Sequence, residues 1–307
     1  MKILHKFNET LKAFISRYCN KKYSLYDKLY VSQFYSAIES YIIPHMYNQL
    51  KVTAREKSVE TRVIALFSPQ AKSLEESLKN ILNRVVLWDL IFNGKSYLKI
   101  VRETDAVSLI PLHNAFLNGI YPFLYYKDIS SSEVNINETP YAWLYYKDII
   151  CIKLPRELRI EISSLIKALA YYSDNFPLPE FVREELENSI PLDPTIPYEL
   201  LRICHLQYLF KANKNIGWNS SSFLGDNALE YYKILLFFRF HKFIVQLRSD
   251  IYNQINIAIK KCLNDFKSEN FIFIDHPVTA EVIDDAIFKL TSGNTSFDDL
   301  LKPFANT

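Results

Sequence analysis

Glycine is scarce in this chain, with only five glycines among 307 residues. Because glycine permits left-handed turns and close backbone approach, few glycines leave few places for a phosphate-binding loop. Residues 92–101 read FNGKSYLKIV, and NGKS resembles the end of such a loop. The motif GxxxxGK[ST] requires a glycine five positions before Gly94, where the chain has Asp89, and it requires a strand before the loop. Here a helical pattern comes first, so we interpret Gly94 as the left-handed end of a helix and exclude a nucleotide site.

Paired cysteines and long apolar runs are also missing. The four cysteines lie far apart without a CxxC pair, at Cys19, Cys151, Cys204 and Cys262. This spacing predicts reduced thiols in an intracellular protein. No secretory segment follows Met1, and no apolar run approaches the ~18 residues of a membrane span. We therefore expect a soluble protein with no membrane partner.

The familiar catalytic motifs are absent as well. The chain contains no HExxH, no GxSxG and no metal-ligand spacing among its six histidines. His205 follows Cys204 within an apolar helical pattern, which predicts a packed pair, and His241 beside Lys242 is expected on a solvated helix face. We expect no enzyme activity, no catalytic residue, no metal site and no cofactor. An enzyme whose site is assembled from distant segments stays open as an alternative.

Charge is present in blocks of opposite sign, although the net charge is only +2. Residues 1–30 carry a net +5 and residues 227–267 a net +4, whereas residues 155–205 carry −4 and residues 268–307 carry −5. Such blocks suit a protein that meets a polyanion or oppositely charged copies of itself. Ordinary solvated helix faces would give a similar distribution.

Apolar spacing predicts an α+β protein that is predominantly helical. Residues 1–50 show amphipathic helical patterns, and residues 72–92 show a clear helix that ends at Gly94. The period then changes to that of strands, which we predict at 96–103, 107–112, 120–128 and 141–154. These strands predict one small antiparallel sheet within residues 94–154.

The second half of the chain returns to helical patterns. A helix is expected at 160–172, a proline-rich connector at 177–197 and a further helix at 199–212. A polar stretch at 213–227 precedes about 39 residues without glycine or proline, far more than the ~11–12 residues of an average helix. A strand at 271–275, a helix at 279–290 and a capping box formed by Ser296 and Asp299 complete the pattern.

The order of these elements resembles that of the portal, or head-to-tail connector, proteins of tailed bacteriophages. In the segment GKSYLKIVRETDAVSLIPL the matching positions are Gly94, Tyr97, Leu98, Ile100, Arg102, Leu109, Pro111 and Leu112. In later segments they are Asp148, Ile149, Ile150, Ile152, Phe223, Leu224, Gly225, Leu247, Ile251, Ile255 and Asn256. The C-terminal segment 277–301 is similar to the last helices of that family. The chain departs from the family by its short length and by Val245, or a neighbour, in place of a proline in the long helix.

This resemblance implies a portal-like fold with a small antiparallel sheet, a compact stem, one very long wing helix and C-terminal helices. The expected segments are wing-like N-terminal helices and sheet at 1–154, a stem and clip at 155–212, a tunnel-like loop at 213–227, the long helix at 228–267 and a crown-like segment at 268–307.

The resemblance also implies a function. The family forms homo-oligomeric rings, usually of twelve copies, at one vertex of the capsid in the virion, after assembly in the host cytoplasm. Double-stranded DNA passes through the ring during packaging and ejection without being read, and the major capsid protein, terminase and tail adaptor bind the ring. The residues expected to face DNA are Lys211, Asn213, Lys214, Asn215, Asn219, Ser220, Ser221 and Ser222. Such polar side chains can touch phosphates without holding the duplex tightly. The alternative is a helical nucleic-acid or protein interaction module that acts as a monomer or dimer.

Overall fold

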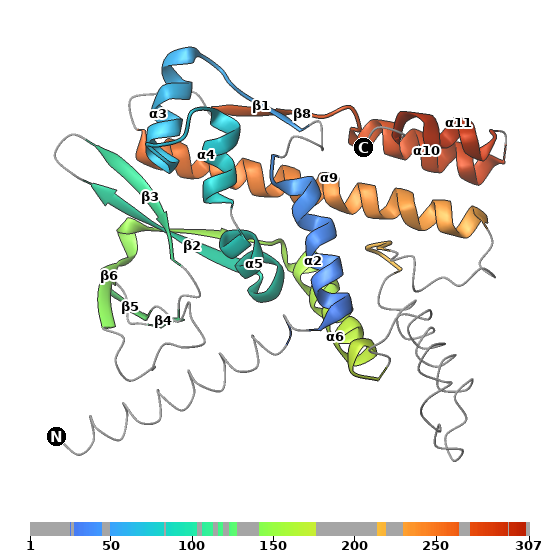
Figure 1. Cartoon of the computed structure of the whole chain (residues 1–307), viewed down its shortest axis with the longest axis horizontal. Coiled ribbons are helices and arrows are strands. Elements are labelled where there is room, and N and C mark those ends of the chain that lie inside the picture. The colour runs from blue at the N-terminus through green and yellow to red at the C-terminus, as the bar shows by residue number, and fades with distance from the viewer. Residues whose placement is uncertain are drawn as a thin grey trace, which may run out of the picture. The chain divides into compact units, whose positions relative to one another are not determined.

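A computed structural model of the 307-residue chain describes residues 25, 28–44, 50–82, 84–102, 106–112, 116–118, 123–127, 141–175, 214–218, 230–263, 271–293 and 295–304 (Figure 1). The described residues fall into two compact units. Unit 1 contains Glu39–Leu154 and Ser249–Asp275, and unit 2 contains Tyr26–Ile38, Pro155–Arg248 and His276–Thr307, each limited to its described part. The predicted portal-like segments, from 1–154 to 268–307, stay a prediction.

The described elements are mostly helices, accompanied by short strands. The helices are α2 (Leu29–Ile42), α3 (Lys57–Phe67), α4 (Leu74–Ile81), α5 (Arg84–Asn93), α6 (Arg156–Asn175), α9 (Glu230–Cys262), α10 (Ala280–Ser292) and α11 (Phe297–Leu301). The strands are β1 (Lys51–Ala54), β2 (Lys95–Arg102), β3 (Val107–Pro111), β4 (Phe116–Asn118), β5 (Phe123–Lys127), β6 (Tyr141–Tyr145), β7 (Ile149–Lys153) and β8 (Ile272–Asp275). Two 3-10 turns are η1 (Tyr146–Asp148) and η2 (Lys302–Phe304). The expected class, a mostly helical α+β protein with small antiparallel sheets, is confirmed.

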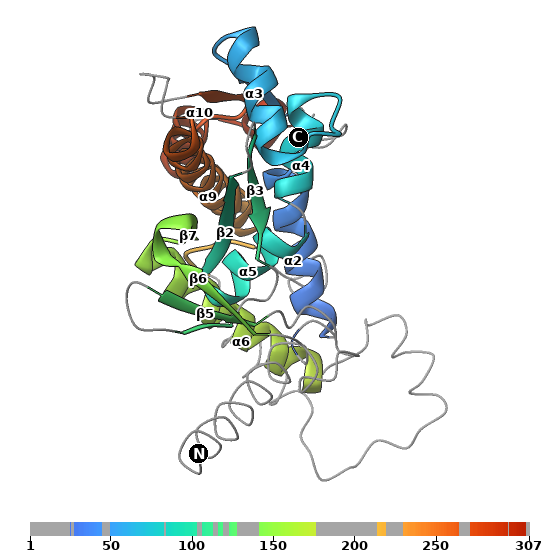
Figure 2. The same cartoon turned by 90° about the vertical axis from the view of Figure 1, so that its left-hand side faces the viewer.

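Strand β2 is the centre of a three-stranded antiparallel sheet in unit 1, with β3 on one side and β7 on the other (Figure 2). Along β2, Ser96, Leu98 and Ile100 are buried, whereas the residues between them are only partly buried. This alternation is the period of a half-buried strand, and the strands predicted at 96–103 and 107–112 are confirmed.

The prediction of one sheet within residues 94–154 is wrong. The described residues form a second antiparallel sheet of β4, β5 and β6, separate from the sheet around β2. The strand predicted at 141–154 is interrupted by η1, so that its two halves join different sheets. Lys147 and Asp148 in η1 interrupt an otherwise aromatic and aliphatic segment, but two charged residues alone do not distinguish a 3-10 turn from a continuous strand.

A third pairing, β1 with β8, was only half predicted. The strand at 271–275 was expected, but KVTA at β1 is too short to show a period. Its antiparallel partner lies more than two hundred residues later in the chain, where Lys51 pairs with Asp275. A pairing this distant in sequence leaves no local signal.

The single helix predicted over 72–92 is two helices. Ser73 caps α4 by accepting a hydrogen bond from the Glu76 N–H, and α4 ends at Ile81 before α5 begins at Arg84. The apolar spacing of three and four residues continues through Leu82, which conceals the break. The helix stop at Gly94 is confirmed, because Gly94 has a φ of 70° and β2 begins at the next residue.

The longest helix is α9, with 33 residues, which confirms the long helix expected at 228–267. Its residues up to Arg248 belong to unit 2 and those from Ser249 belong to unit 1. In unit 2, α9 packs against α10, α11 and η2 (Figure 1). The shared apolar core consists of Ile234, Phe238, Val278, Ile283, Ala286, Leu290, Leu300 and Phe304. Among the described helices, none combines the length and apolar composition that a membrane crossing requires.

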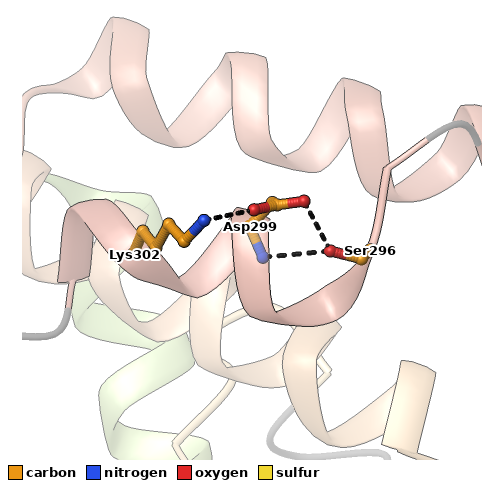
Figure 3. A network of polar contacts seen from close by, with 3 residues as sticks. All are labelled: Ser296, Asp299 and Lys302. Atoms are coloured by element: carbon orange, nitrogen blue, oxygen red, sulfur yellow. Dashed lines mark hydrogen bonds and ion pairs between the residues drawn. The ribbon is translucent and has the colours of Figure 1, made fainter.

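Helix α11 begins at the predicted capping box (Figure 3). The Asp299 N–H donates to Ser296 Oγ at 3.2 Å, and Ser296 Oγ donates to Asp299 Oδ2 at 2.7 Å. Lys302 adds an ion pair to the same carboxylate. These contacts satisfy a free N–H at the helix start and favour a negative charge there.

Candidate anion-binding groove

The turn formed by residues 214–218 lies tightly against α9. Gly217 has a φ of 76°, and a Cβ atom built on it would lie 2.4 Å from Leu236 O and 2.7 Å from Phe240 N. The neighbours Ile216 and Trp218 are buried. On the same side, Arg239 Nη1 donates to Lys214 O at 2.9 Å. Only glycine permits this approach, because it has no side chain at that point.

Two of the eight side chains expected to face DNA lie in this turn. Lys214 and Asn215 are exposed, and Asn215 Nδ2 donates to Glu161 Oε1 on α6 at 2.9 Å. The other six lie outside the described residues: Lys211, Asn213, Asn219, Ser220, Ser221 and Ser222. The structure therefore describes the predicted loop 213–227 only where it is attached to α6 and α9.

The turn closes one end of a groove between α6 and α9, all within unit 2. We call it the α6–α9 groove; it has a volume of about 570 Å³. Its lining residues are Leu158, Glu161, Lys214, Asn215, Tyr232, Leu235, Arg239, Lys242, Phe243 and Gln246. The α9 members recur three or four positions apart, so they form one stripe along the helix. The apolar lining residues Leu158, Leu235 and Phe243 alternate with the polar ones.

The groove carries an excess of positive charge. Three cationic side chains, Lys214, Arg239 and Lys242, line it together with one carboxylate, Glu161. Lys242 Nζ also forms an ion pair with Asp284 Oδ1 at 2.6 Å, and both side chains are about half exposed. Exposed ion pairs of this kind contribute about 0–1 kcal/mol and can exchange partners. The arrangement can hold a carboxylate or a phosphate.

Tyr232 lines the same groove as a neutral phenol. Burial raises the pKa of Tyr232, and the nearby Arg239 charge opposes that shift only in part. At neutral pH the hydroxyl is therefore protonated, and its oxygen is buried.

Groups that usually perform chemistry lie elsewhere. Burial raises the pKa of the Cys151 thiol, and it raises the pKa of the Cys262 thiol to about 11. Both free thiols therefore stay protonated at neutral pH. Within the described residues no three His, Cys, Asp or Glu side chains are grouped as a metal site would require. The predicted pair of Cys204 and His205 lies outside the described residues.

The prediction that His241 lies on a solvated face is wrong. His241 is 3% exposed and packs edge-on against Phe237, with ring centroids 4.2 Å apart, and near Phe304. Burial, followed by the charges of His276 and Arg248, lowers the pKa of His241 to about 4. His241 falls on the α9 stripe that faces the C-terminal core, although Lys242 beside it lies in the groove.

Sequence reasoning missed the groove side chains Tyr232, Leu235, Arg239 and Gln246. The signal that could have found them is their helical spacing around Arg239 and Lys242 within an otherwise apolar stretch. Glu161 lines the same groove from a separate helix, α6. No local pattern in the sequence reveals that α6 lies beside this part of α9.

Protein families and curated proteins give no match to this chain. The similarity to portal proteins therefore remains a prediction from the residues quoted above.

Proposed function

We propose that the chain is a structural portal subunit of a tailed bacteriophage. In this proposal, copies form a ring at one capsid vertex of the virion, usually of twelve subunits, through which double-stranded DNA is packaged and ejected. The ring also holds the capsid protein, terminase and tail adaptor. The subunit is structural and catalyses no reaction.

The observation that carries the proposal is the convergence of two separate motif segments in one sheet. The residues of β2 and β3 that resemble the family and those of β7 belong to the same three-stranded sheet. Arg102 Nη1 lies 2.6 Å from Asp148 Oδ1, so motif positions 46 residues apart form an ion pair. The proposal requires these motif segments to be neighbours in the fold, and they are.

The long helix gives further support. Helix α9 has 33 residues and follows a polar segment that is expected to be the tunnel-like loop. A loop that allows DNA to slide requires weak contacts, because each neutralised phosphate strengthens binding and makes it more dependent on salt. The loop 213–227 contains Lys214 as its only basic residue, which suits weak contact.

The α6–α9 groove favours the second candidate function, a protein or nucleic-acid interaction module that acts as a monomer or dimer. A basic groove of about 570 Å³ is sufficient for such a role without any ring. The two functions differ in the number of chains in the particle.

Light scattering of the purified full chain tests the proposal. A portal subunit should elute at a mass many times that of one 36.1 kDa chain. A monomer or dimer over a hundredfold range of protein concentration would contradict the portal function and favour the interaction module.

A further inference from the structure

We propose that the α6–α9 groove of one chain receives the acidic outer face of α10 from the next copy. This inference rests on the proposed ring and identifies the two surfaces that would join its subunits. The acidic face of α10 consists of Glu281, Asp284, Asp285 and Phe288.

The acidic face of α10 ends in an exposed aromatic side chain, Phe288. Phe288 is 70% exposed, although the opposite side of α10 places Ile283, Ala286 and Leu290 in the core. Glu281 and Asp285 precede Phe288 by seven and three positions, which places all three on one side of the helix. Aromatic side chains, Phe among them, are enriched at the centres of protein interfaces, with polar residues at the rim.

The α6–α9 groove offers the complementary features. It places apolar side chains at Leu158, Leu235 and Phe243 between the cations at Lys214, Arg239 and Lys242. Leu158 and Phe243 are already buried, so a Phe ring would pack on the partly exposed Leu235 while carboxylates approach the cations. Its volume of about 570 Å³ exceeds that of one aromatic side chain.

The charges around the acidic face remain available to a partner. Asp284 and Asp285 form exposed ion pairs with Lys242 and Lys289, and such pairs exchange readily. Glu281 accepts a hydrogen bond from the Thr279 side chain, and this bond is the main reason why the pKa of Glu281 is lowered. Glu281 is therefore ionised at neutral pH. Helices α10 and α11 together carry five acidic residues and one basic residue, Lys289.

A protein occupant suits this groove better than DNA does. A phosphate backbone offers no apolar group to cover the partly exposed Leu235, and Glu161 would repel it. An acidic helix meets the same carboxylate, but it gains apolar burial at Phe288.

The groove and the acidic face are different patches whose edges adjoin through the ion pair between Lys242 and Asp284, and in the proposed ring the contact between successive copies is heterologous. A heterologous contact repeats from copy to copy and closes into a ring when the rotation between copies allows it. The same groove and helix face therefore provide both sides of every subunit interface.

The test uses two full-length variants that each damage one surface. Phe288→Asp damages the acidic face, and Lys214→Glu combined with Gln246→Glu damages the groove. Both groove positions are exposed, and the double change leaves two cations against three acids at the rim. Sedimentation velocity should show each variant alone as a monomer, with its association weakened by about tenfold or more.

Mixing the two variants distinguishes a heterologous contact from any other. The groove variant keeps an intact α10 face and the Phe288→Asp variant keeps an intact groove, so a 1:1 mixture should form a dimer and nothing larger. Ile257→Asp, at a side chain that is 66% exposed on the unit 1 part of α9, is the matched control and should keep the wild-type mass.

The possible failures are separable. If wild type forms a large ring and both variants form the same ring, the assignment of these two surfaces is overturned while the portal function stands. If the control dissociates as the variants do, the assignment to Phe288 is overturned. If wild type is a monomer, the portal function and this inference both fail. If the groove variant keeps its assembly and loses retention of a double-stranded DNA fragment, the groove faces DNA and the proposed partner is wrong.

Discussion

The side-chain amide of Gln254 binds the backbone of Lys153 twice. The Lys153 N–H donates to Gln254 Oε1 at 2.7 Å, and Gln254 Nε2 donates to Lys153 O at 2.7 Å. Lys153 lies in β7, an outer strand of the sheet around β2, and Lys261 Nζ donates to Ile149 O at the other end of that strand. Side chains of α9 thus occupy positions that another strand could use, which protects the edge from unwanted pairing.

We predict that Gln254→Ala lowers the free energy of unfolding by about 1–2 kcal/mol, because the edge of β7 loses two hydrogen bonds. Loss of this protection should also increase aggregation on mild heating. Urea unfolding and light scattering measure the two effects. Asn253→Ala, one position earlier on α9 and exposed, is the control and should change stability by less than about 0.5 kcal/mol. Equal effects of the two substitutions would contradict the role of Gln254.

Asn256 should be the most costly polar residue to remove from α9. It is 4% exposed; its Oδ1 accepts from the N–H groups of Phe271 and Ile272, and its Nδ2 donates to Ile272 O. Asn256→Ala leaves these buried backbone groups without partners, so we expect a loss of about 3 kcal/mol or more. Asn256→Asp keeps the two accepted bonds but faces Ile272 O with an oxygen. Its free energy of unfolding should therefore be lower than that of wild type by at least about 1 kcal/mol. Urea unfolding of both variants provides the comparison, and wild-type stability in Asn256→Ala would refute the prediction.

Two glycines with similar backbone angles should respond differently to alanine. Gly217 has a φ of 76° and Gly293 a φ of 69°, but only Gly217 has α9 backbone atoms within 3 Å of the position that a Cβ would take. Gly293→Ala should lower stability by about 1 kcal/mol from the left-handed backbone alone. Gly217→Ala should cost about 3 kcal/mol or more, because the turn must move away from α9. Thermal unfolding gives both values, and a similar loss in both variants would show that the close approach has no effect.

Acid should destabilise the protein through His241. Its pKa is lowered from 6.5 to about 4 in the fold, so the unfolded chain binds a proton at a higher pH than the folded chain does. The stability linked to His241 is therefore complete above pH 6.5 and is lost as the pH falls toward 4. The loss should be on the order of 3 kcal/mol, and His241→Phe should abolish that part of the pH dependence. Unfolding free energies measured from pH 7 to pH 4 test this, and identical pH slopes in wild type and variant would contradict it.

The sequence predicted elements that are defined by local signals. The long helix appeared because about 39 residues lack glycine and proline, and the stop at Gly94 appeared because a change of period follows it. The cap at Ser296 was visible as a pair of side chains three positions apart. Each of these features depends on a few neighbouring residues, which is why it could be predicted.

Features that depend on distant contacts could not be predicted in the same way. The pairing of β1 with β8, the split of residues 141–154 between two sheets and the burial of His241 are each decided by partners far along the chain. The groove was missed for the same reason, because α9 supplies its cations but α6 supplies Glu161. Of the predicted loop residues, Lys214 and Asn215 were found beside this groove, a position that the polar sequence around them did not indicate.

Negative-stain imaging of the purified full chain tests the portal assignment most directly. A portal subunit should give round particles of uniform diameter with a stain-filled opening on the axis, each built from many copies. Small solid particles of one or two chains would contradict the portal assignment, if the protein is imaged at a concentration at which portal rings are fully assembled.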